Sequence, residues 1–300
     1  MALSTQTEVR PALACEISAD RVIAARSASK PLRMEMFTSR RLSAGAIAPG
    51  LNAPNVLDRG ALGTAIQEAL GALSGKSRDV IAIIPDASIR VLLLDFETLP
   101  AKQQESDAVV RFRLKKSLPF DVEHAALSYD VQRTNGTVQV VAAISPDSIV
   151  AEYEAAFRDA GYSPGVLLSS SLASLGLVDA ARPTLVLKID SLNITVAAAA
   201  GGVLRLIRTL DNPSGHNVTA AELAEAVLPS VVFFEDTFGA RVEQILVGGA
   251  AALAEIAPML QQQTGAQVQE LAPAESQEQN LSGDKLSPSL MAGVAGALLG

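Results

Sequence analysis

The pattern of hydrophobic and polar positions predicts strands that occur in two similar groups. Short apolar runs separated by small polar turns predict the first group, at residues 13–17, 21–26 and 32–39. Runs of the same kind predict the second group, at residues 184–189, 193–200 and 203–209. Segments with helical periodicity follow each group. This repetition indicates an internal duplication of one α/β unit.

Helices are predicted from apolar spacing and from signals at their ends. Apolar periodicity predicts them at residues 57–73, 146–160, 220–238, 250–264 and 288–299. Ser145 is predicted to be the N-cap of the second of these, with Pro146 at its first position. Thr219 and Glu222 have the spacing of a capping box, and Pro229 is expected to kink or divide the helix that they begin.

The middle of the chain carries a pattern that neither group of strands repeats. Apolar runs predict strands at residues 80–84, 89–96, 126–132 and 137–144. Residues 101–117 are predicted to form a helix after Pro100, with acidic residues in its first half and basic residues in its second. That order of charges matches the helix dipole. Leu118-Pro119-Phe120 then ends the helix, because proline cannot continue it.

This middle block resembles the inserted subdomain of the PilM family. Members of that family are actin-like proteins of type IV pilus assembly. Four segments carry the resemblance: IAIIPD at 81–86, LP at 99–100, SLPFDVEHAALSYDV at 117–131 and SPD at 145–147. The same order of elements extends over nearly the whole chain. The resemblance implies an α/β protein with the actin-like ATPase fold, a duplicated RNase H-like fold with an inserted small α+β subdomain. The expected divisions are a first actin-like subdomain at 1–77, the insertion at 78–164, and the second half at 165–300 with a polar loop at 272–287.

Composition and charge exclude several classes of protein. A formal net charge of -8 and an aromatic content of 4% without tryptophan argue against nucleic-acid binding. The single cysteine, Cys15, cannot form an internal disulfide, which fits a reducing compartment. No signal peptide is visible, and the longest apolar run, 194–204, is shorter than the roughly 20 residues that span a bilayer. We therefore expect a soluble cytoplasmic protein that does not insert into a membrane directly.

The resemblance implies a cleft for ATP and Mg2+ whose phosphate-binding turns read Asp-x-Gly, and both turns depart from that pattern here. Glycine lets backbone N–H groups approach an anion closely, and the aspartate organises the metal or the attacking water. The first turn has Glu16 and Ser18 at the acid and glycine positions, and the second has Lys188 and Asp190. We therefore expect weak or absent nucleotide binding and no useful hydrolysis.

Gly248-Gly249 resembles the adenosine-binding turn and completes the set of candidate nucleotide residues. Simpler interpretations stay open for two of these segments. Asp190-Ser191 is equally compatible with an ordinary hairpin turn, and a Gly-Gly pair also simply connects a strand to a helix. ATP and Mg2+ thus remain ligands only if the cleft is still competent to bind them.

No other set of residues has the spacing of a catalytic or metal site. The two histidines, His124 and His216, lie in separate regions, and neither belongs to a metal-ligand pattern. The three serines at 169–171 lack the Gly-x-Ser-x-Gly motif of a hydrolase nucleophile. The sequence therefore does not favour an enzyme.

The resemblance also implies a protein partner. In the PilM family, a groove between the core and the inserted subdomain receives the cytoplasmic tail of the membrane protein PilN, which we expect to bind as an extended peptide. By this resemblance the groove is expected to involve Ile89, Val91, Arg113, Lys116, Leu118 and Phe120. Arg113 and Lys116 would then contact an acidic or polar peptide. Pilus motor ATPases and further copies of the chain are additional candidate partners.

The leading hypothesis is thus a scaffold of a type IV pilus or type II secretion complex, peripheral to the inner membrane through its PilN-like partner. The alternative is a nucleotide-binding switch or polymer similar to FtsA, which would require intact phosphate turns. A sugar or acetate kinase is least favoured, because it needs catalytic acids in those turns. The secretion protein GspL is similar in fold but continues into a transmembrane helix.

Overall fold

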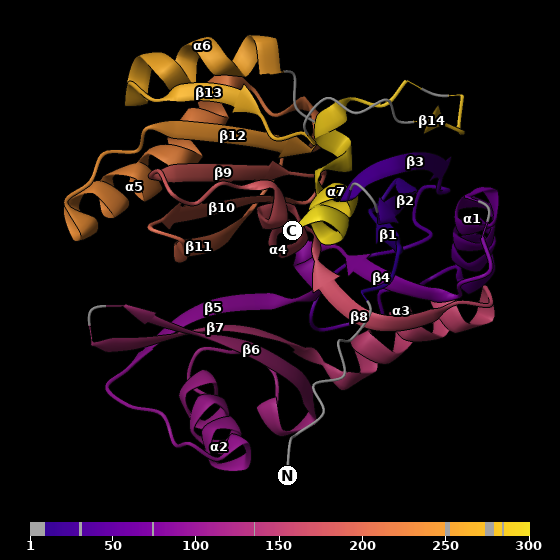
Figure 1. Ribbon diagram of the computed structural model, residues 1–300, viewed down its shortest axis with the longest axis horizontal. Coiled ribbons are helices and arrows are strands. Elements are labelled where there is room, and N and C mark those ends of the chain that lie inside the picture. The colour runs from indigo at the N-terminus through magenta and orange to yellow at the C-terminus, as the bar shows by residue number, and fades with distance from the viewer. Residues whose placement is uncertain are drawn as a thin grey trace.

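The strands that the structure describes form three sheets, which Figure 1 shows in a computed structural model. The structure describes residues 10–29, 32–73, 75–134, 136–249, 253–273, 279–283 and 285–300. The predicted start of one helix at 250–252 and parts of the polar loop predicted at 272–287 lie outside the described residues. No helix among the described residues is both long enough and apolar enough to cross a membrane.

The first sheet has six strands in the order β14-β3-β2-β1-β4-β8. Its strands are β1 (Leu13–Ile17), β2 (Arg21–Ser29), β3 (Leu32–Arg41), β4 (Asp79–Ile84), β8 (Ser163–Ser169) and β14 (Gln279–Asn280). Strand β1 is antiparallel to β2 and parallel to β4, and every residue of β1 is buried. The end of this central strand, where Glu16 lies, therefore faces the interior of the molecule.

The second sheet repeats that arrangement with five strands. Its order is β11-β10-β9-β12-β13, which matches β3-β2-β1-β4-β8 strand for strand. Its strands are β9 (Thr184–Ile189), β10 (Asn193–Ala200), β11 (Val203–Asp211), β12 (Gln244–Gly249) and β13 (Gln267–Glu270). Strand β9 is antiparallel to β10 and parallel to β12, as β1 is to its own neighbours. The predicted duplication is confirmed.

Helices cover the first sheet on both faces and the second sheet on one face. Helices α1 (Arg59–Ala72) and α3 (Asp147–Asp159) pack on one face of the first sheet through a core that includes Ile66, Tyr153 and Phe157. Helices α5 (Ala220–Phe238) and α6 (Leu253–Thr264) cover the second sheet.

Helix α7 joins the two halves. The short helix α4 (Ser170–Ser174) and α7 (Ala292–Leu299) lie on the other face of the first sheet. The first residue of α7, Ala292, packs in a core with Val186 and Leu246 of the second sheet. Figure 1 shows α7 between the two sheets. The position of one half against the other therefore depends on this helix.

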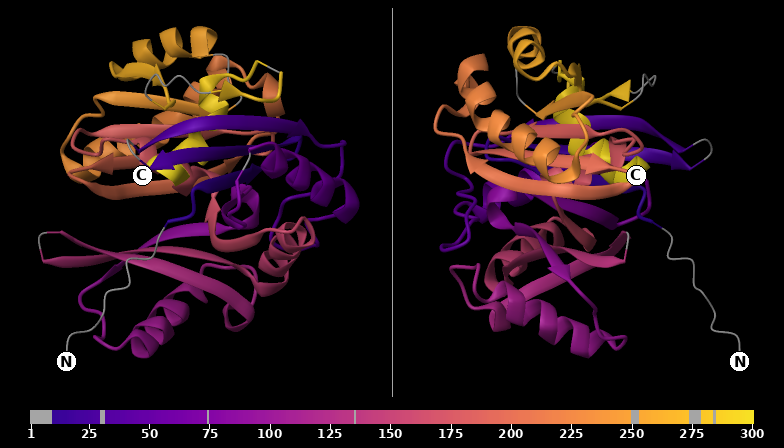
Figure 2. Two further views of the ribbon diagram at one scale, coloured as in Figure 1. Left: turned by 45° about the vertical axis from the view of Figure 1, so that its right-hand side comes forward. Right: turned by 90° about the vertical axis from the view of Figure 1, so that its left-hand side faces the viewer.

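The inserted unit is a three-stranded sheet with one helix on its outer face. It consists of β5 (Arg90–Phe96), α2 (Gln103–Leu114), β6 (Ala125–Thr134) and β7 (Thr137–Pro146), with sheet order β5-β7-β6. This unit spans residues 90–146, whereas the sequence predicted an insertion at 78–164. The flanking strands β4 and β8 pair with each other in the first sheet, and Figure 2 shows the three-stranded unit below the two larger sheets.

The signals at the helix ends predicted one observed cap correctly and one incorrectly. The capping box of Thr219 and Glu222 is present, and α5 runs as one helix through Pro229. Ser145, by contrast, does not cap α3: the N-cap is Pro146, and the Ser145 hydroxyl donates to the backbone oxygen of Ser88, 2.7 Å away. Ser145 is buried at the end of β7. Its hydroxyl bonds to the backbone carbonyl of Ser88 there, so it does not cap the helix.

Candidate functional site

A cleft lies where the two halves meet, at the carboxyl ends of β1 and β9. It is bordered by the turn after β1 and by the turn after β9, and Glu16, Ser18, Lys188, Asp190 and Gly249 all line it. Its volume is about 50 Å³, well below the ~300–1,000 Å³ of typical small-molecule pockets. The structure therefore brings five of the six predicted nucleotide residues together, but around a space that is nearly closed.

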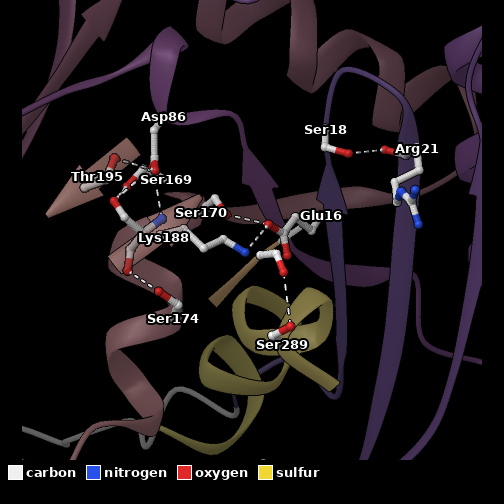
Figure 3. A network of polar contacts seen from close by, with 12 residues as sticks. Glu16, Ser18, Arg21, Asp86, Ser169, Ser170, Ser174, Lys188, Thr195 and Ser289 are labelled. Carbon is white, nitrogen blue, oxygen red and sulfur yellow. Dashed lines mark hydrogen bonds and ion pairs between the residues drawn. The ribbon is translucent and has the colours of Figure 1, made fainter. Parts of the chain in front are cut away.

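A buried ion pair between the two halves occupies the centre of this cleft. The Nζ of Lys188 lies 3.4 Å from Oε1 of Glu16, and the two side chains are 5% and 7% exposed. The hydroxyl of Ser170 donates to the same Glu16 oxygen, as Figure 3 shows. Each residue comes from the central strand of its own sheet, so the pair links the two duplicated units directly.

The second oxygen of Glu16 lies against the first turn of α7. A Cβ atom on Gly293, the second residue of that helix, would lie 2.2 Å from Oε2 of Glu16. The start of a helix carries partial positive charge and free N–H groups, and it commonly holds phosphate or carboxylate groups. Lys188 and Ser170 contact Oε1, whereas Oε2 faces the helix start without accepting a hydrogen bond from the described residues. The Glu16 carboxylate thus lies near a helix N-terminus, where other proteins hold phosphate groups.

Asp86 forms a second polar link between the halves. Its carboxylate accepts hydrogen bonds from the backbone N–H of Ser171 at 3.0 Å, from the Ser171 hydroxyl at 2.9 Å and from the Thr195 hydroxyl at 3.0 Å. Asp86 follows β4 in the first half, whereas Thr195 belongs to β10 in the second. Sequence reasoning did not select Asp86 as a site residue, although an acid placed directly after the buried run at 80–84 was a visible signal.

Asp190 has a local role at the turn between β9 and β10. Its Oδ1 accepts the backbone N–H groups of Leu192 at 2.7 Å and of Asn193 at 2.8 Å. This is the hairpin turn that the simpler interpretation predicted. Burial, and after it the nearby charge of Asp86, raise the pKa of the Asp190 carboxyl to about 6.

This raised pKa predicts a pH dependence of stability. The folded protein holds the Asp190 proton more tightly than the unfolded chain does, so its contribution to the free energy of unfolding is largest below the ordinary pKa of about 4. That contribution falls as the pH rises from there to about 6. In urea unfolding at a series of pH values, Asp190→Asn should lose less stability than the natural protein across this window. Parallel pH profiles of the two proteins would contradict the assignment.

The Gly248-Gly249 pair is part of β12 and is not the predicted turn. Both residues pair with β9 in parallel register. Gly249 has a φ of +96°, and a Cβ atom there would lie 1.9 Å from the backbone oxygen of Ile189. Its own carbonyl accepts from the Ser289 hydroxyl at 3.1 Å. The glycines therefore allow a close approach of protein backbone, and their surroundings are filled by the chain itself.

A larger groove lies between the inserted unit and the second half. Its volume is about 900 Å³, and it is formed by β5, β11 and α5. The apolar side chains along it are Val91, Leu92, Leu93, Phe96, Leu206, Ile207, Phe233 and Phe238. Phe233 is 51% exposed. The guanidinium of Arg205 lies over the ring of Phe238, 5.5 Å from its centroid. The groove is open, and apolar and polar groups contribute about equally to its lining.

Comparisons with known proteins were made for the sequence and for the structure. No protein-family model matches the sequence, and no curated protein matches it. Among solved structures, the chain is similar to one in a PilM-PilN type IV pilus biogenesis complex, with a TM-score of 0.81 and 20% identity over 96% of this chain and 97% of that one. It is also similar to a Bacteroides thetaiotaomicron protein with an actin-like ATPase fold, with a TM-score of 0.54 and 11% identity over 86% and 89% of the two chains.

This chain has the actin-like ATPase fold. A third similar structure is the cytoplasmic domain of EpsL, an inner-membrane component of the type II secretion system of Vibrio cholerae, with a TM-score of 0.53 and 12% identity over 96% of this chain and 94% of that one. The predicted fold class is confirmed. The cleft between the duplicated halves of this chain is filled by the side chains of Glu16 and Lys188.

The residues predicted to bind a partner do not form one surface. Val91 lines the groove, but Ile89 is buried in the core of the first half. Leu118 and Phe120 are half-buried and pack against the core beneath α2, and Arg113 on α2 is exposed.

Lys116, the last of the predicted partner residues, is exposed just beyond the end of α2. Sequence reasoning missed the other wall of the groove, which β11 and α5 provide. The available signal was the large apolar residues at 232–233, which fall on the exposed side of a helix.

Proposed function

We propose that this protein is a cytoplasmic scaffold of a type IV pilus assembly complex, which binds the tail of a PilN-like membrane protein in the groove between β5 and β11. The observation that carries the proposal is the similarity to a chain of the PilM-PilN complex over nearly the full length of both proteins, with a TM-score of 0.81. The similarity to EpsL is lower, at 0.53, so a pilus complex is favoured over a type II secretion complex.

The backbone of the groove supports binding of an extended peptide. Strand β5 is at the edge of the three-stranded sheet, and β11 is at the edge of the five-stranded sheet. Each edge strand has a row of N–H and C=O groups that no neighbouring strand of the described residues uses. An extended peptide can pair with such an edge and gain backbone hydrogen bonds, while its side chains enter pockets on alternate sides.

The side chains of the groove indicate what the peptide should contain. Val91, Leu93 and Phe233 offer apolar contact, and Asp95 and Glu97 lie at the same groove. An extended tail with apolar residues and a basic residue would complement this lining. Such a tail would be held without help from Arg113, which is on α2, or from Lys116, which follows that helix.

The cleft supports a scaffold rather than a nucleotide-driven switch. A nucleotide would have to displace the buried Glu16–Lys188 pair, and separating two such charges leaves each of them without its partner in a poorly solvated site. The alternative of an FtsA-like switch needs the cleft to open and to accept ATP with Mg2+. We infer that the closed cleft instead holds the two halves in a fixed arrangement for partner binding.

Calorimetric titration with a synthetic tail of the PilN-like protein from the same organism tests this proposal. Phe233→Glu places a charge among the apolar side chains of the groove and should weaken binding at least ~30-fold, as expected for loss of a central aromatic contact. Val232→Glu is the matched control, because Val232 is 54% exposed on the same helix but does not line the groove. This control should change the affinity less than ~3-fold. No binding by the natural protein, or equal binding by Phe233→Glu, would contradict the proposal.

A further inference from the structure

Helix α2 has an outer face on which an aromatic ring and three cations lie together. Phe112 is 70% exposed, more than any other large apolar residue that the structure describes, and Val109 one turn earlier is 37% exposed. Arg113, Lys115 and Lys116 are exposed beside them. An exposed apolar patch that is bordered by polar or charged residues is a feature of interaction sites.

The three cations have no acidic partner within the part of the protein that the structure describes. Among the described residues, none of them forms an ion pair. Arg111 on the same helix differs, because its guanidinium donates to the backbone oxygens of Val122 and Ala125. Arg111 therefore links α2 to the rest of its own subdomain, whereas the three cations that follow it are exposed to solvent.

The position of α2 suits contact with a broad surface. The helix packs its Val110 and Leu114 against the three-stranded sheet and covers the face of that sheet opposite the groove. Figures 1 and 2 show it at the extremity of the molecule, away from both larger sheets. The outer side of a single helix is convex, so it cannot enclose a peptide as the groove can.

We propose that this face of α2 docks on a membrane surface that contains anionic lipid. Basic side chains are attracted to anionic headgroups, and an exposed aromatic ring inserts at the boundary between headgroups and acyl chains. The remainder of a chain with net charge -8 is repelled by the same surface, so the molecule would approach with α2 foremost. This contact goes beyond the proposed tail binding and does not depend on it.

Co-sedimentation of the full chain with phosphatidylglycerol–phosphatidylcholine vesicles tests this inference. The natural protein should bind these vesicles at low salt, bind them less at high salt, and not bind vesicles of phosphatidylcholine alone. Replacing Arg113, Lys115 and Lys116 by Glu should lower the vesicle affinity at least ~100-fold. Phe112→Ser tests the aromatic ring and should also weaken binding.

A second charge variant separates a local patch from overall charge. Arg33→Glu, Arg41→Glu and Lys76→Glu together change the net charge by the same amount at three other exposed positions. This variant should keep most of the vesicle binding. The inference would be overturned if the natural protein failed to bind the anionic vesicles, or if the two charge variants lost the same amount of vesicle binding. Binding to an acidic protein without any binding to lipid would also overturn it. Because the tail titration uses no lipid, its outcome is independent of this one.

Discussion

Replacing Lys188 by Met is expected to lower the free energy of unfolding by about 3–5 kcal/mol. The substitution keeps a similar volume but leaves the buried Glu16 carboxylate without its cation. The Ser170 hydroxyl still donates to Oε1, but Oε2 is buried and accepts no hydrogen bond from the described residues. Urea unfolding followed by circular dichroism measures the loss. A cost below ~1 kcal/mol would show that the pair is not a significant link between the halves.

A double-mutant cycle distinguishes the ion pair from simple packing. In Glu16→Gln with Lys188→Met, neither residue is charged, and Gln can still accept from Ser170. Removing both members of a buried pair is often close to neutral, so the double variant should be more stable than Lys188→Met alone by about 2 kcal/mol or more. Strictly additive losses would mean that the two side chains contribute independently.

Replacing Gly296 by Ala is expected to destabilise the protein by about 2–3 kcal/mol, because a single methyl group there has no space. Its Cβ atom would lie 2.1 Å from the backbone oxygen of Ala173, so α7 would have to move away from α4. Movement of α7 would also disturb Ala292, which packs against the second sheet. The expected loss therefore includes contacts in both halves.

Gly71→Ala is the matched control for that substitution. Gly71 also lies in a helix, but no atom lies within 4 Å of where its Cβ would be. Alanine has the higher helix propensity, so this variant should be more stable than the natural protein by about 0.5–1 kcal/mol. Thermal and urea unfolding should thus both show a loss of stability for Gly296→Ala and a gain for Gly71→Ala. Equal effects at both positions would contradict the close packing of α7.

Much of the fold could be predicted from the sequence because its signals are local. Each apolar run that was interpreted as a strand is a strand, and the two groups of strands form sheets of the same order. The error at Ser145 is also informative. Its position before Pro146 is typical of an N-cap, but a buried carbonyl from Ser88 takes its hydroxyl, and no local pattern contains that contact.

The candidate site could be predicted only in part. Glu16 and Lys188 were selected as departures from a phosphate-binding pattern, but their ion pair depends on how two distant strands meet. The groove was missed on one side for the same reason. Its walls come from β5 and β11, which belong to different sheets and become neighbours only in the folded protein.

We propose that this actin-like chain binds its partner while its own side chains close the cleft between the duplicated halves. Calorimetric titration with the PilN-like tail, in the absence and in the presence of Mg-ATP, tests this proposal together with a titration of Mg-ATP alone. We expect one tail per chain, the same affinity in both conditions and no binding of Mg-ATP. Tight binding of Mg-ATP, or tail binding that requires it, would overturn the proposal and favour the nucleotide-driven switch.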